Sequence, residues 1–316
     1  MADIAILDDY QQVALKLADW SGLQKAHRIE VFHEPFASEA AAATALAGFE
    51  VIGIMRERTP FARSLFQALP KLKLLVTTGK RNASVDTAAA KELGVTVCAT
   101  GGSGKSTADL AFGLILGLAR HLPTEAANMR AGRWQTTVGF DLAGRTLGII
   151  GLGNLGAQVA RVGAAFGMTV IAWSENLTED RALKAGAKLV GKEELFRTAD
   201  VVTIHTVLSP RTRGLVGSRE LALMKPTALL INTSRGPIVD GSAVLDALRA
   251  NRIAGYGADV YDTEPLPADH PLRKEPRALL TPHIGYVTEE TYRQFYGGMV
   301  SAIEAWLAGK PINVLT

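Results

Sequence analysis

The chain of 316 residues is long enough for two domains of ordinary size, and its 47% hydrophobic content with 31 glycines is typical of buried parallel sheets joined by tight turns. The formal net charge of +3 is small and the basic residues are spread along the chain, so we do not expect a nucleic-acid-binding protein. The single cysteine, Cys98, excludes an intramolecular disulfide and cysteine-cluster metal sites, and we expect no bound metal.

The apolar runs are all short. None approaches the roughly 20 residues that a membrane span requires, and the first run, Ile4–Leu7, is not preceded by a basic leader. We therefore expect a cytoplasmic protein that does not bind membranes.

The first hundred residues alternate short apolar runs with helical segments. Strands are predicted at Ile4–Leu7, Ile29–Phe32, Val51–Ile54, Leu72–Val76 and Val95–Cys98. Helices are predicted at Gln11–Trp20, Glu39–Ala47, Phe61–Ala68 and Val85–Leu93. This alternation predicts βαβ units and a parallel sheet.

The pattern changes after the first hundred residues. One long apolar helix is predicted over Thr107–Leu122, and Pro123–Asp141 is polar and irregular. A second series of strands is then predicted at Leu147–Ile150, Thr169–Trp173, Lys188–Val190, Val201–His205, Ala228–Thr233, Ile253–Val260 and Ala278–Leu280. An amphipathic helix is predicted at Thr288–Leu307. Two such series predict two α/β domains with a ligand-binding cleft between them.

The stretch 147–173 contains the most informative motif. An apolar strand leads into Gly151-Leu152-Gly153-Asn154-Leu155-Gly156, and an amphipathic helix and a second strand follow. In this context the glycines indicate a dinucleotide-binding turn: Gly151 permits the turn, Gly153 lets a pyrophosphate approach, and Gly156 lets the helix pack on the strand. The alternative is a glycine-rich turn that binds nothing, and it leaves this context unexplained.

The end of the second strand bears on the choice of cofactor. Ser174 occupies the position where an acidic residue usually holds the adenosine ribose, and Glu175 follows it. Glu175 would repel the extra phosphate of NADP, and no arginine lies nearby to bind that phosphate. The sequence therefore favours NAD and leaves NADP open.

Three later segments each place a reactive side chain just after a predicted strand. They deliver Arg235, then Asp259 and Glu264, then His283. A histidine can donate a proton near neutral pH, a neighbouring carboxylate favours its charged form, and a guanidinium can hold a carboxylate with two hydrogen bonds. Each residue alone also fits a structural role, but together behind a dinucleotide site they favour function.

The segments 232–240, 259–265 and 281–285, with the glycine motif, resemble the D-isomer-specific 2-hydroxyacid dehydrogenase family over essentially the whole chain. Glyoxylate/hydroxypyruvate reductases and D-3-phosphoglycerate dehydrogenases are among the proteins it resembles. The resemblance implies two parallel-sheet domains, Rossmann-like or flavodoxin-like. It also implies NAD(P)-dependent oxidation of the CH–OH group of a D-2-hydroxy acid, or the reverse reduction.

The resemblance also implies roles for single residues. Arg235 would bind substrate, His283 would be the acid/base, and Glu264 would tune it. The cofactor would be held by Gly151, Gly153, Asn154, Leu155, Gly156, Ser174, Glu175, Thr206, Thr233, Ser234, Asp259 and Thr107. The substrate would be held by Thr78, Gly79, Lys80, Arg81 and Arg235.

The resemblance further implies the domain organisation. Residues 1–102 with 286–316 would form the substrate domain and 103–285 the cofactor domain. Members are commonly homodimers, and the 107–122 helix would lie at the interface.

Three departures from the family pattern concern specificity. Ser174 replaces an acid, Val207 replaces a proline, and Lys80-Arg81-Asn82 replaces a small glycine-rich loop. We hypothesise that Lys80 or Arg81 faces a second polar or anionic group of the substrate.

Two alternatives come from other classes of protein. Gly101–Thr107 looks like the phosphate-binding loop of a nucleotide hydrolase, but the first glycine of that pattern is Ala99 here and no magnesium-binding partner is evident. A non-catalytic NAD-sensing protein, like a corepressor of the same fold, is the second alternative.

Overall fold

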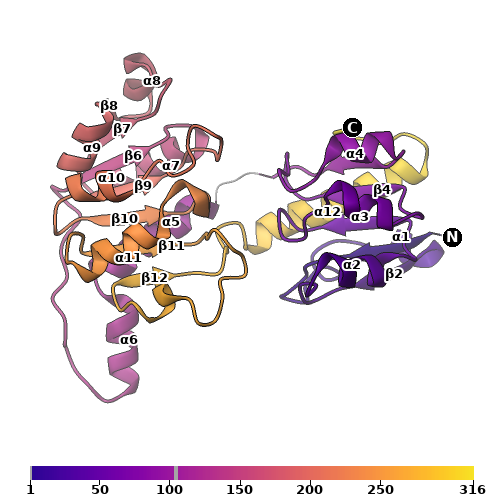
Figure 1. Cartoon of the computed structure of the whole chain (residues 1–316), viewed down its shortest axis with the longest axis horizontal. Helices are drawn as coiled ribbons and strands as arrows, with labels where there is room; N and C mark the ends of the chain where they lie inside the picture. Colours follow the sequence, from indigo (N-terminus) through magenta and orange to yellow (C-terminus); the bar gives the residue numbers. More distant parts are fainter. Residues whose placement is uncertain (1, 103–105) are drawn as a thin grey trace. The chain divides into compact units, whose positions relative to one another are not determined.

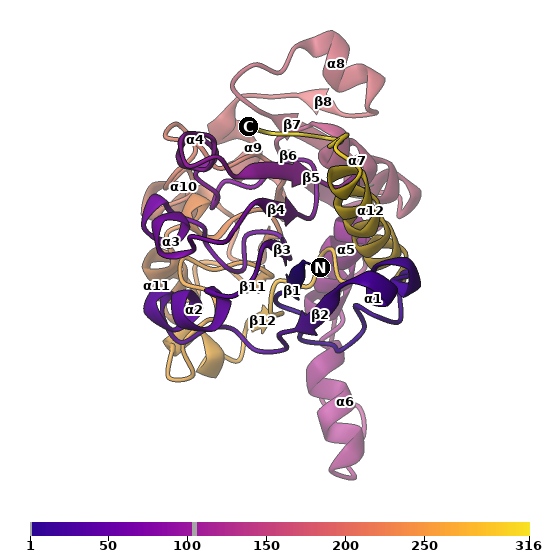
Figure 2. The ribbon, with the colours of Figure 1, turned by 90° about the vertical axis from the view of Figure 1, so that its right-hand side faces the viewer.

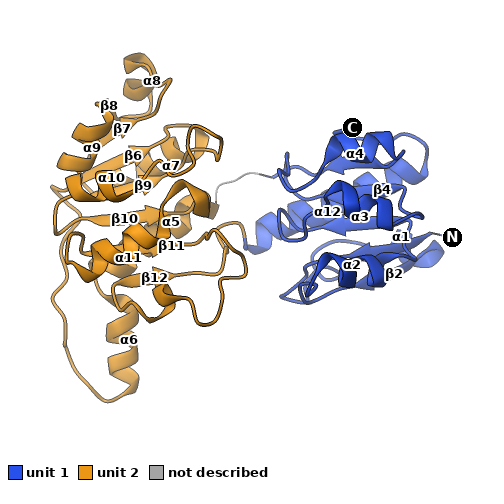
Figure 3. Cartoon of the chain, in the orientation of Figure 1, with its two compact units in different colours: residues 1–103, 287–316 blue, residues 104–286 orange. Residues whose placement is uncertain are grey.

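The structure is a computed structural model that describes residues 2–102 and 106–316 (Figure 1). The chain forms two compact units, shown in different colours in Figure 3. Unit 1 comprises Met1–Ser103 and Val287–Thr316, and unit 2 comprises Gly104–Tyr286. None of the helices in the described ranges is long and apolar enough to span a membrane.

Unit 1 is built on a five-stranded parallel sheet with the order β2-β1-β3-β4-β5. Its strands are β1 Asp3–Ile6, β2 Arg28–Val31, β3 Val51–Ile54, β4 Leu74–Thr77 and β5 Thr96–Ala99. Its helices are α1 Ser21–Ala26, α2 Glu39–Leu46, α3 Arg63–Ala68, α4 Thr87–Glu92 and α12 Glu289–Leu307. The apolar run of β3 is buried on both faces, as parallel strands covered by helices require.

All five predicted strands of unit 1 are present, but the helix predicted at Gln11–Trp20 is wrong. The side chain of Asp9 accepts hydrogen bonds from the N–H groups of Val13 and Ala14, both at 3.0 Å. Gln12 has a left-handed backbone, with φ of 57°. These local bonds compete with helix formation, so the segment forms turns and the helix begins only at Ser21.

Unit 2 is built on a seven-stranded parallel sheet with the order β12-β11-β10-β9-β6-β7-β8. Its strands are β6 Thr146–Ile150, β7 Thr169–Trp173, β8 Lys188–Leu189, β9 Val201–Ile204, β10 Leu229–Asn232, β11 Gly255–Ala258 and β12 Ala278–Leu280. Its α-helices are α5 Ser106–Ala119, α6 Leu122–Arg130, α7 Asn154–Ala165, α8 Glu179–Lys184, α9 Lys192–Thr198, α10 Ser218–Leu223 and α11 Gly241–Arg249, and its 3-10 helices are η1 Gly236–Ile238 and η2 Pro271–Lys274. All seven predicted strands are present, and the predicted α/β class with two parallel sheets is confirmed.

The segment 107–130 differs from the prediction of one helix followed by irregular chain. It forms two helices, because His121 adopts a left-handed backbone (φ 50°) between α5 and α6, and Pro123 lies in the first turn of the second helix, where proline is tolerated. The apolar side chains of α5 are mostly buried inside unit 2 against the sheet. Helix α6 instead projects from the rest of this unit (Figures 1 and 2).

The strand orders mark one place in each sheet for a ligand. In a doubly wound sheet, ligands bind outside the carboxyl ends of the strands where the strand order reverses. In unit 2 this switch point lies between β6 and β9, and in unit 1 it lies between β1 and β3. The glycine motif follows β6 and therefore lies at the switch point of unit 2.

Candidate active site

The three glycines after β6 have three different environments. Gly151 has φ of 93°, and a Cβ there would lie 2.7 Å from the amide nitrogen of Thr206. A Cβ on Gly156 would lie 2.1 Å from the carbonyl oxygen of Gly151, so the helix can pack this closely only without a side chain. A Cβ on Gly153 would meet nothing within 4 Å, and that open space fits the approach of a pyrophosphate.

Helix α7 starts directly behind this open position. Gly153 provides no side-chain cap, and the first turn contains no acidic residue, so neither opposes an anion. Asn154 is exposed and Leu155 is half-buried there. The unpaired N–H groups and the dipole of this helix end suit the phosphates of a dinucleotide.

The edge across the switch point contains buried polar atoms that need partners. The Oγ1 of Thr233 and the Nδ1 of His205 are buried and have no hydrogen-bond partner among the described residues. The Oγ of Ser234 donates to the carbonyl oxygen of Thr206, which joins the loops after β9 and β10. Burial lowers the pKa of His205 to about 4, so its ring is neutral near pH 7. Unsatisfied polar groups of this kind fit a polar ligand lying along the edge.

The end of β7 lies beside the glycine motif, because the N–H of Gly151 donates to the carbonyl oxygen of Trp173 at 2.9 Å. Ser174 is half-buried and Glu175 is exposed directly after this strand. Both residues therefore follow the strand next to the glycine turn, where a dinucleotide would extend its adenosine ribose.

Glu264 and His283 form a direct pair. The Oε2 of Glu264 lies 2.5 Å from the Nδ1 of His283, although 19 residues separate them in the chain. The two side chains are 29% and 17% exposed. They meet because β11 and β12 are neighbouring parallel strands whose carboxyl ends share one edge. The carboxylate fixes the orientation of the imidazole ring through Nδ1.

Asp259 anchors the loop that carries His283. Its carboxylate accepts hydrogen bonds from the hydroxyl of Thr281 (2.6 Å) and from the N–H groups of Ile284 and Gly285 (both 2.8 Å). Burial raises the pKa of Asp259, against the effect of these donors. The hydroxyl of Thr107 donates to the carbonyl oxygen of Gly285 at 3.1 Å and holds the same loop from α5. Sequence reasoning missed this anchoring role of Asp259 and Thr107, although their positions at the strand and helix ends could have indicated it.

Arg235 lies on a loop that touches the loop of Glu264. Its Nη1 donates to the carbonyl oxygen of Ser234 at 2.7 Å, and the side chain of Asn232 donates to the carbonyl oxygen of Arg235 at 3.0 Å. A Cβ on Gly236 would lie 2.0 Å from the carbonyl carbon of Tyr261, so the two loop backbones are in contact. The structure thus brings Arg235 to the same sheet edge as Glu264 and His283.

In unit 1, the predicted substrate loop follows β4. The N–H groups of Thr78 and Gly79 are already bonded, to the carbonyl oxygen of Ile54 (3.1 Å) and the hydroxyl of Thr100 (2.9 Å). Lys80 and Arg81 are exposed, and within the described residues their N–H groups and side chains make no hydrogen bond or ion pair. Among the described residues, Lys80 and Arg81 therefore keep exposed donors that an anion could use.

Sequence reasoning did not single out two polar residues that follow neighbouring strands at the switch point of unit 1. Asp8, after β1, is buried and accepts a hydrogen bond from the hydroxyl of Thr59 at 3.0 Å. Burial raises the pKa of Asp8 to about 6. Arg56, after β3, lies 3.5 Å from a carboxylate oxygen of Glu57 and from the carbonyl oxygen of Thr78. Their positions directly after two strands were the signal in the sequence.

Comparison with known proteins identifies the class. The family described as "D-isomer specific 2-hydroxyacid dehydrogenase, NAD binding domain" matches residues 112–285. A D-3-phosphoglycerate dehydrogenase of Bacillus subtilis is 36% identical over 262 residues, which cover 82% of this chain and 50% of that protein. A glyoxylate reductase of Korarchaeum cryptofilum is 36% identical over 239 residues, 73% of this chain and 72% of that protein. The crystal structure of a phosphoglycerate oxidoreductase from Vibrio cholerae superposes with a TM-score of 0.93 at 36% identity, covering 98% of this chain and all of that one.

The chain belongs to the D-isomer-specific 2-hydroxyacid dehydrogenase family, and its cofactor is NAD(H). It spans about half the length of the D-3-phosphoglycerate dehydrogenase from Bacillus subtilis. The loop at 101–107 that resembles a phosphate-binding loop includes residues 103–105, which lie outside the described residues.

Proposed function

We propose that this protein is an NAD-dependent dehydrogenase that interconverts a 2-keto acid and a D-2-hydroxy acid. The observation that carries the proposal is the 2.5 Å contact between Glu264 and His283 at the edge of the NAD-binding sheet. A protein that only binds a dinucleotide, without catalysis, does not need an acid/base pair at the sheet edge that also carries an arginine. Unit 1 would be the substrate domain and unit 2 the cofactor domain.

The pair accounts for proton transfer. When bound, the reduced cofactor supplies a hydride to the carbonyl carbon of the keto acid. His283 donates a proton from Nε2 to the carbonyl oxygen, so that the carbonyl becomes an alcohol, and it takes the proton back in the reverse reaction. The Glu264 carboxylate accepts a hydrogen bond from the Nδ1–H group of His283 and so favours the protonated ring that donates from Nε2.

Arg235 accounts for substrate orientation. Its guanidinium is planar and always charged, so it can bind the substrate carboxylate through two parallel hydrogen bonds. From unit 1, the backbone N–H groups of Lys80 and Arg81, which have no partner among the described residues, would supply donors to the substrate. The side chain of Lys80 or Arg81 would then face a second polar or anionic group of the substrate.

For the cofactor, the 151–156 turn would hold the pyrophosphate and Glu175 would hold the adenosine ribose. Thr206, Thr233 and Ser234 would line its path toward the nicotinamide. Asp259 would face the nicotinamide carboxamide in addition to its observed hydrogen bonds with the 281–285 loop. Because Glu175 is acidic, we expect NADH to be preferred to NADPH.

The test follows the absorbance of NADH and NADPH in parallel with a panel of 2-keto acids that includes glyoxylate and hydroxypyruvate. His283→Ala should lower kcat/KM by roughly 10²–10⁴-fold, because it removes the proton donor. His27→Ala, which alters a histidine of unit 1 outside the proposed site, is the matched control.

Two experimental outcomes would overturn the proposed dehydrogenase function. If NADH binds but neither cofactor is oxidised with any acid, the protein is an NAD sensor instead. If ATP binds in a calorimetric titration and is hydrolysed, the nucleotide hydrolase alternative takes its place.

The substrate class is tested with Lys80→Ala and Arg81→Ala. We expect one of them to raise KM for a keto acid with a second anionic group by about 10-fold, the typical cost of a lost charge-assisted hydrogen bond, and to change KM for glyoxylate much less. Equal KM values for both acids in both variants would contradict this role.

We also propose a cytoplasmic homodimer. Helix α6 and the following segment expose Trp134 (73%) and Val138 (93%), whereas the apolar face of α5, which we predicted at the interface, is used within unit 2. The double variant Trp134→Ser/Val138→Ser should be monomeric by light scattering. Leu183→Ser, which alters an equally exposed leucine on α8 (75%), should stay dimeric. Co-fractionation with a cytosolic marker tests the compartment.

A further inference from the structure

Between Asp259 and Glu264 lies Tyr261, which sequence reasoning did not single out. We propose that Tyr261 is a positioning residue that holds both members of the Glu264–His283 pair in register. This inference rests on the proposed function, in which that pair transfers the proton.

The backbone of Tyr261 orients the carboxylate. Its N–H donates to Oε1 of Glu264 at 2.9 Å, and the other oxygen, Oε2, lies 2.5 Å from Nδ1 of His283. With one oxygen fixed by a backbone donor, the carboxylate cannot rotate without breaking that bond. The second oxygen therefore stays directed at the imidazole.

The side chain of Tyr261 holds the loop on which the imidazole lies. Its hydroxyl lies 2.9 Å from the carbonyl oxygen of Thr281 and 3.1 Å from that of Ala258. The same Thr281 oxygen accepts the N–H of His283 at 3.0 Å. Ala258 ends β11 and Thr281 follows β12, so this hydroxyl, whose single proton is shared between the two oxygens, bridges the two strand ends beside His283.

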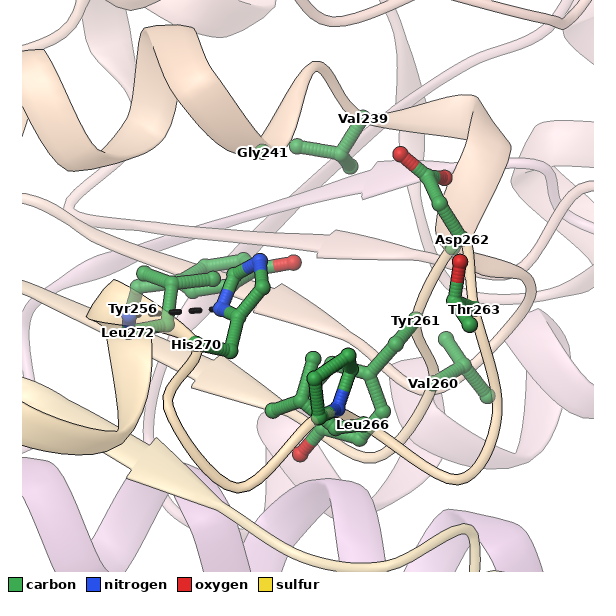
Figure 4. Close-up of a pocket in the computed structure, with 12 residues that line it drawn as sticks. Val239, Gly241, Tyr256, Val260, Tyr261, Asp262, Thr263, Leu266, His270 and Leu272 are labelled. Carbon is green, nitrogen blue, oxygen red and sulfur yellow. Dashed lines mark hydrogen bonds between the residues drawn. The ribbon is translucent and has the colours of Figure 1, made fainter.

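These hydrogen bonds position the Tyr261 side chain, because packing holds its ring only in part. A cavity of about 110 Å³ lies against the ring, lined mainly by apolar groups (Figure 4). Figure 4 shows Val260, Leu266 and Tyr261 around it, with Tyr256 and Leu272 on the other side. Atoms that border a cavity lack dispersion contacts on that side, so hydrogen bonds must define the geometry there. Burial also raises the pKa of Tyr261, which keeps its hydroxyl protonated as a donor to carbonyl oxygens.

The first test is Tyr261→Phe, which removes the hydroxyl and keeps the ring and the backbone N–H. We expect kcat to fall about 10-fold, the effect of one hydrogen bond of ordinary strength, with KM and NADH affinity changed less than about twofold. Tyr296→Phe is the matched control, since it removes a buried hydroxyl that donates to Asp9 in unit 1. It should leave kcat unchanged at a similar cost in thermal stability.

A double-mutant cycle with Glu264→Gln tests whether Tyr261 acts through the pair. In the Glu264→Gln background, Tyr261→Phe should lower kcat much less than in the wild type. The ring ¹⁵N signals of His283 at fixed pH, and the pH profile of kcat, should shift in Tyr261→Phe and not in Tyr296→Phe.

The outcomes separate this inference from the proposed function. An unchanged kcat, or an equal loss of kcat in both backgrounds with unchanged His283 signals, overturns the role of Tyr261. Full turnover in His283→Ala would overturn the proposed function instead, and with it the reason for a positioned pair.

Discussion

The carboxyl edges of the two sheets differ in how far their polar groups are already bonded. In unit 2, Asp259 binds three donors of the 281–285 loop, Tyr261 joins two strand ends, and Glu264 pairs with His283. In unit 1, Lys80 and Arg81 are exposed and unbonded within the described residues, and Oδ2 of the buried Asp8 has no hydrogen-bond partner there.

This difference fits a division of labour. Groups that transfer a proton must be held in one geometry by their surroundings, because a small displacement costs rate. Groups that select a substrate can stay solvated until it arrives. The comparison therefore leads us to expect mutations at the unit 2 edge to cost both stability and activity, and those at the unit 1 loop to alter selectivity alone.

The largest expected effect is at the anchor of unit 2. Asp259→Ala leaves the N–H groups of Ile284 and Gly285 without partners, and we expect the free energy of unfolding to fall by about 2–4 kcal/mol. Urea denaturation of Asp259→Ala and of Asp259→Asn, which keeps one acceptor oxygen, measures this. A loss below about 1 kcal/mol would mean that the loop is held by other contacts.

The next effect concerns the pH dependence of unit 2. Burial lowers the pKa of His205 from 6.5 to about 4, so folding disfavours the charged ring. The contribution of neutral His205 to the free energy of unfolding is fully present above pH 6.5. It falls by about 2–3 kcal/mol as the pH drops toward 4. Hydrogen exchange of β9 peptides, corrected for intrinsic rates, should show this loss in the wild type. His205→Gln, which does not titrate, should lose less, and parallel profiles would refute the assignment.

Unit 1 should respond to pH in the opposite direction. Burial raises the pKa of Asp8 from 3.8 to about 6, so the folded state takes up a proton and gains stability as the pH falls from 6 toward 4. At pH 7.5, Asp8→Asn should stabilise unit 1 by about 1–2 kcal/mol, less than the full shift because the new amide must itself find an acceptor. Hydrogen exchange of β1 and β3 peptides measures this, and a destabilised variant would contradict it.

The smallest effects belong to the substrate loop of unit 1. Lys80→Ala and Arg81→Ala remove exposed side chains without partners among the described residues, so each should change the free energy of unfolding by less than about 0.5 kcal/mol. Chemical denaturation gives the value. A larger loss would mean that the loop is built into unit 1, and the contrast between the two edges would then fail.

The sequence by itself determined the strands, the parallel sheets and the dinucleotide motif. Period, apolar runs and glycine spacing are local properties, and they fixed β3, β7 and β12 to the residue. The sequence also pointed to Arg235, Glu264 and His283, because each lies within a few residues after an apolar run.

Other features depended on contacts between distant residues and were decided only by the tertiary structure. The side chain of Asp9 captures backbone N–H groups that would otherwise form a helix, and the left-handed His121 separates α5 from α6. The pairing of Glu264 with His283, and the bonds of Asp259 and Tyr261, exist because β11 and β12 lie side by side. A linear pattern contains the strands but not their order, and the order decides which side chains meet.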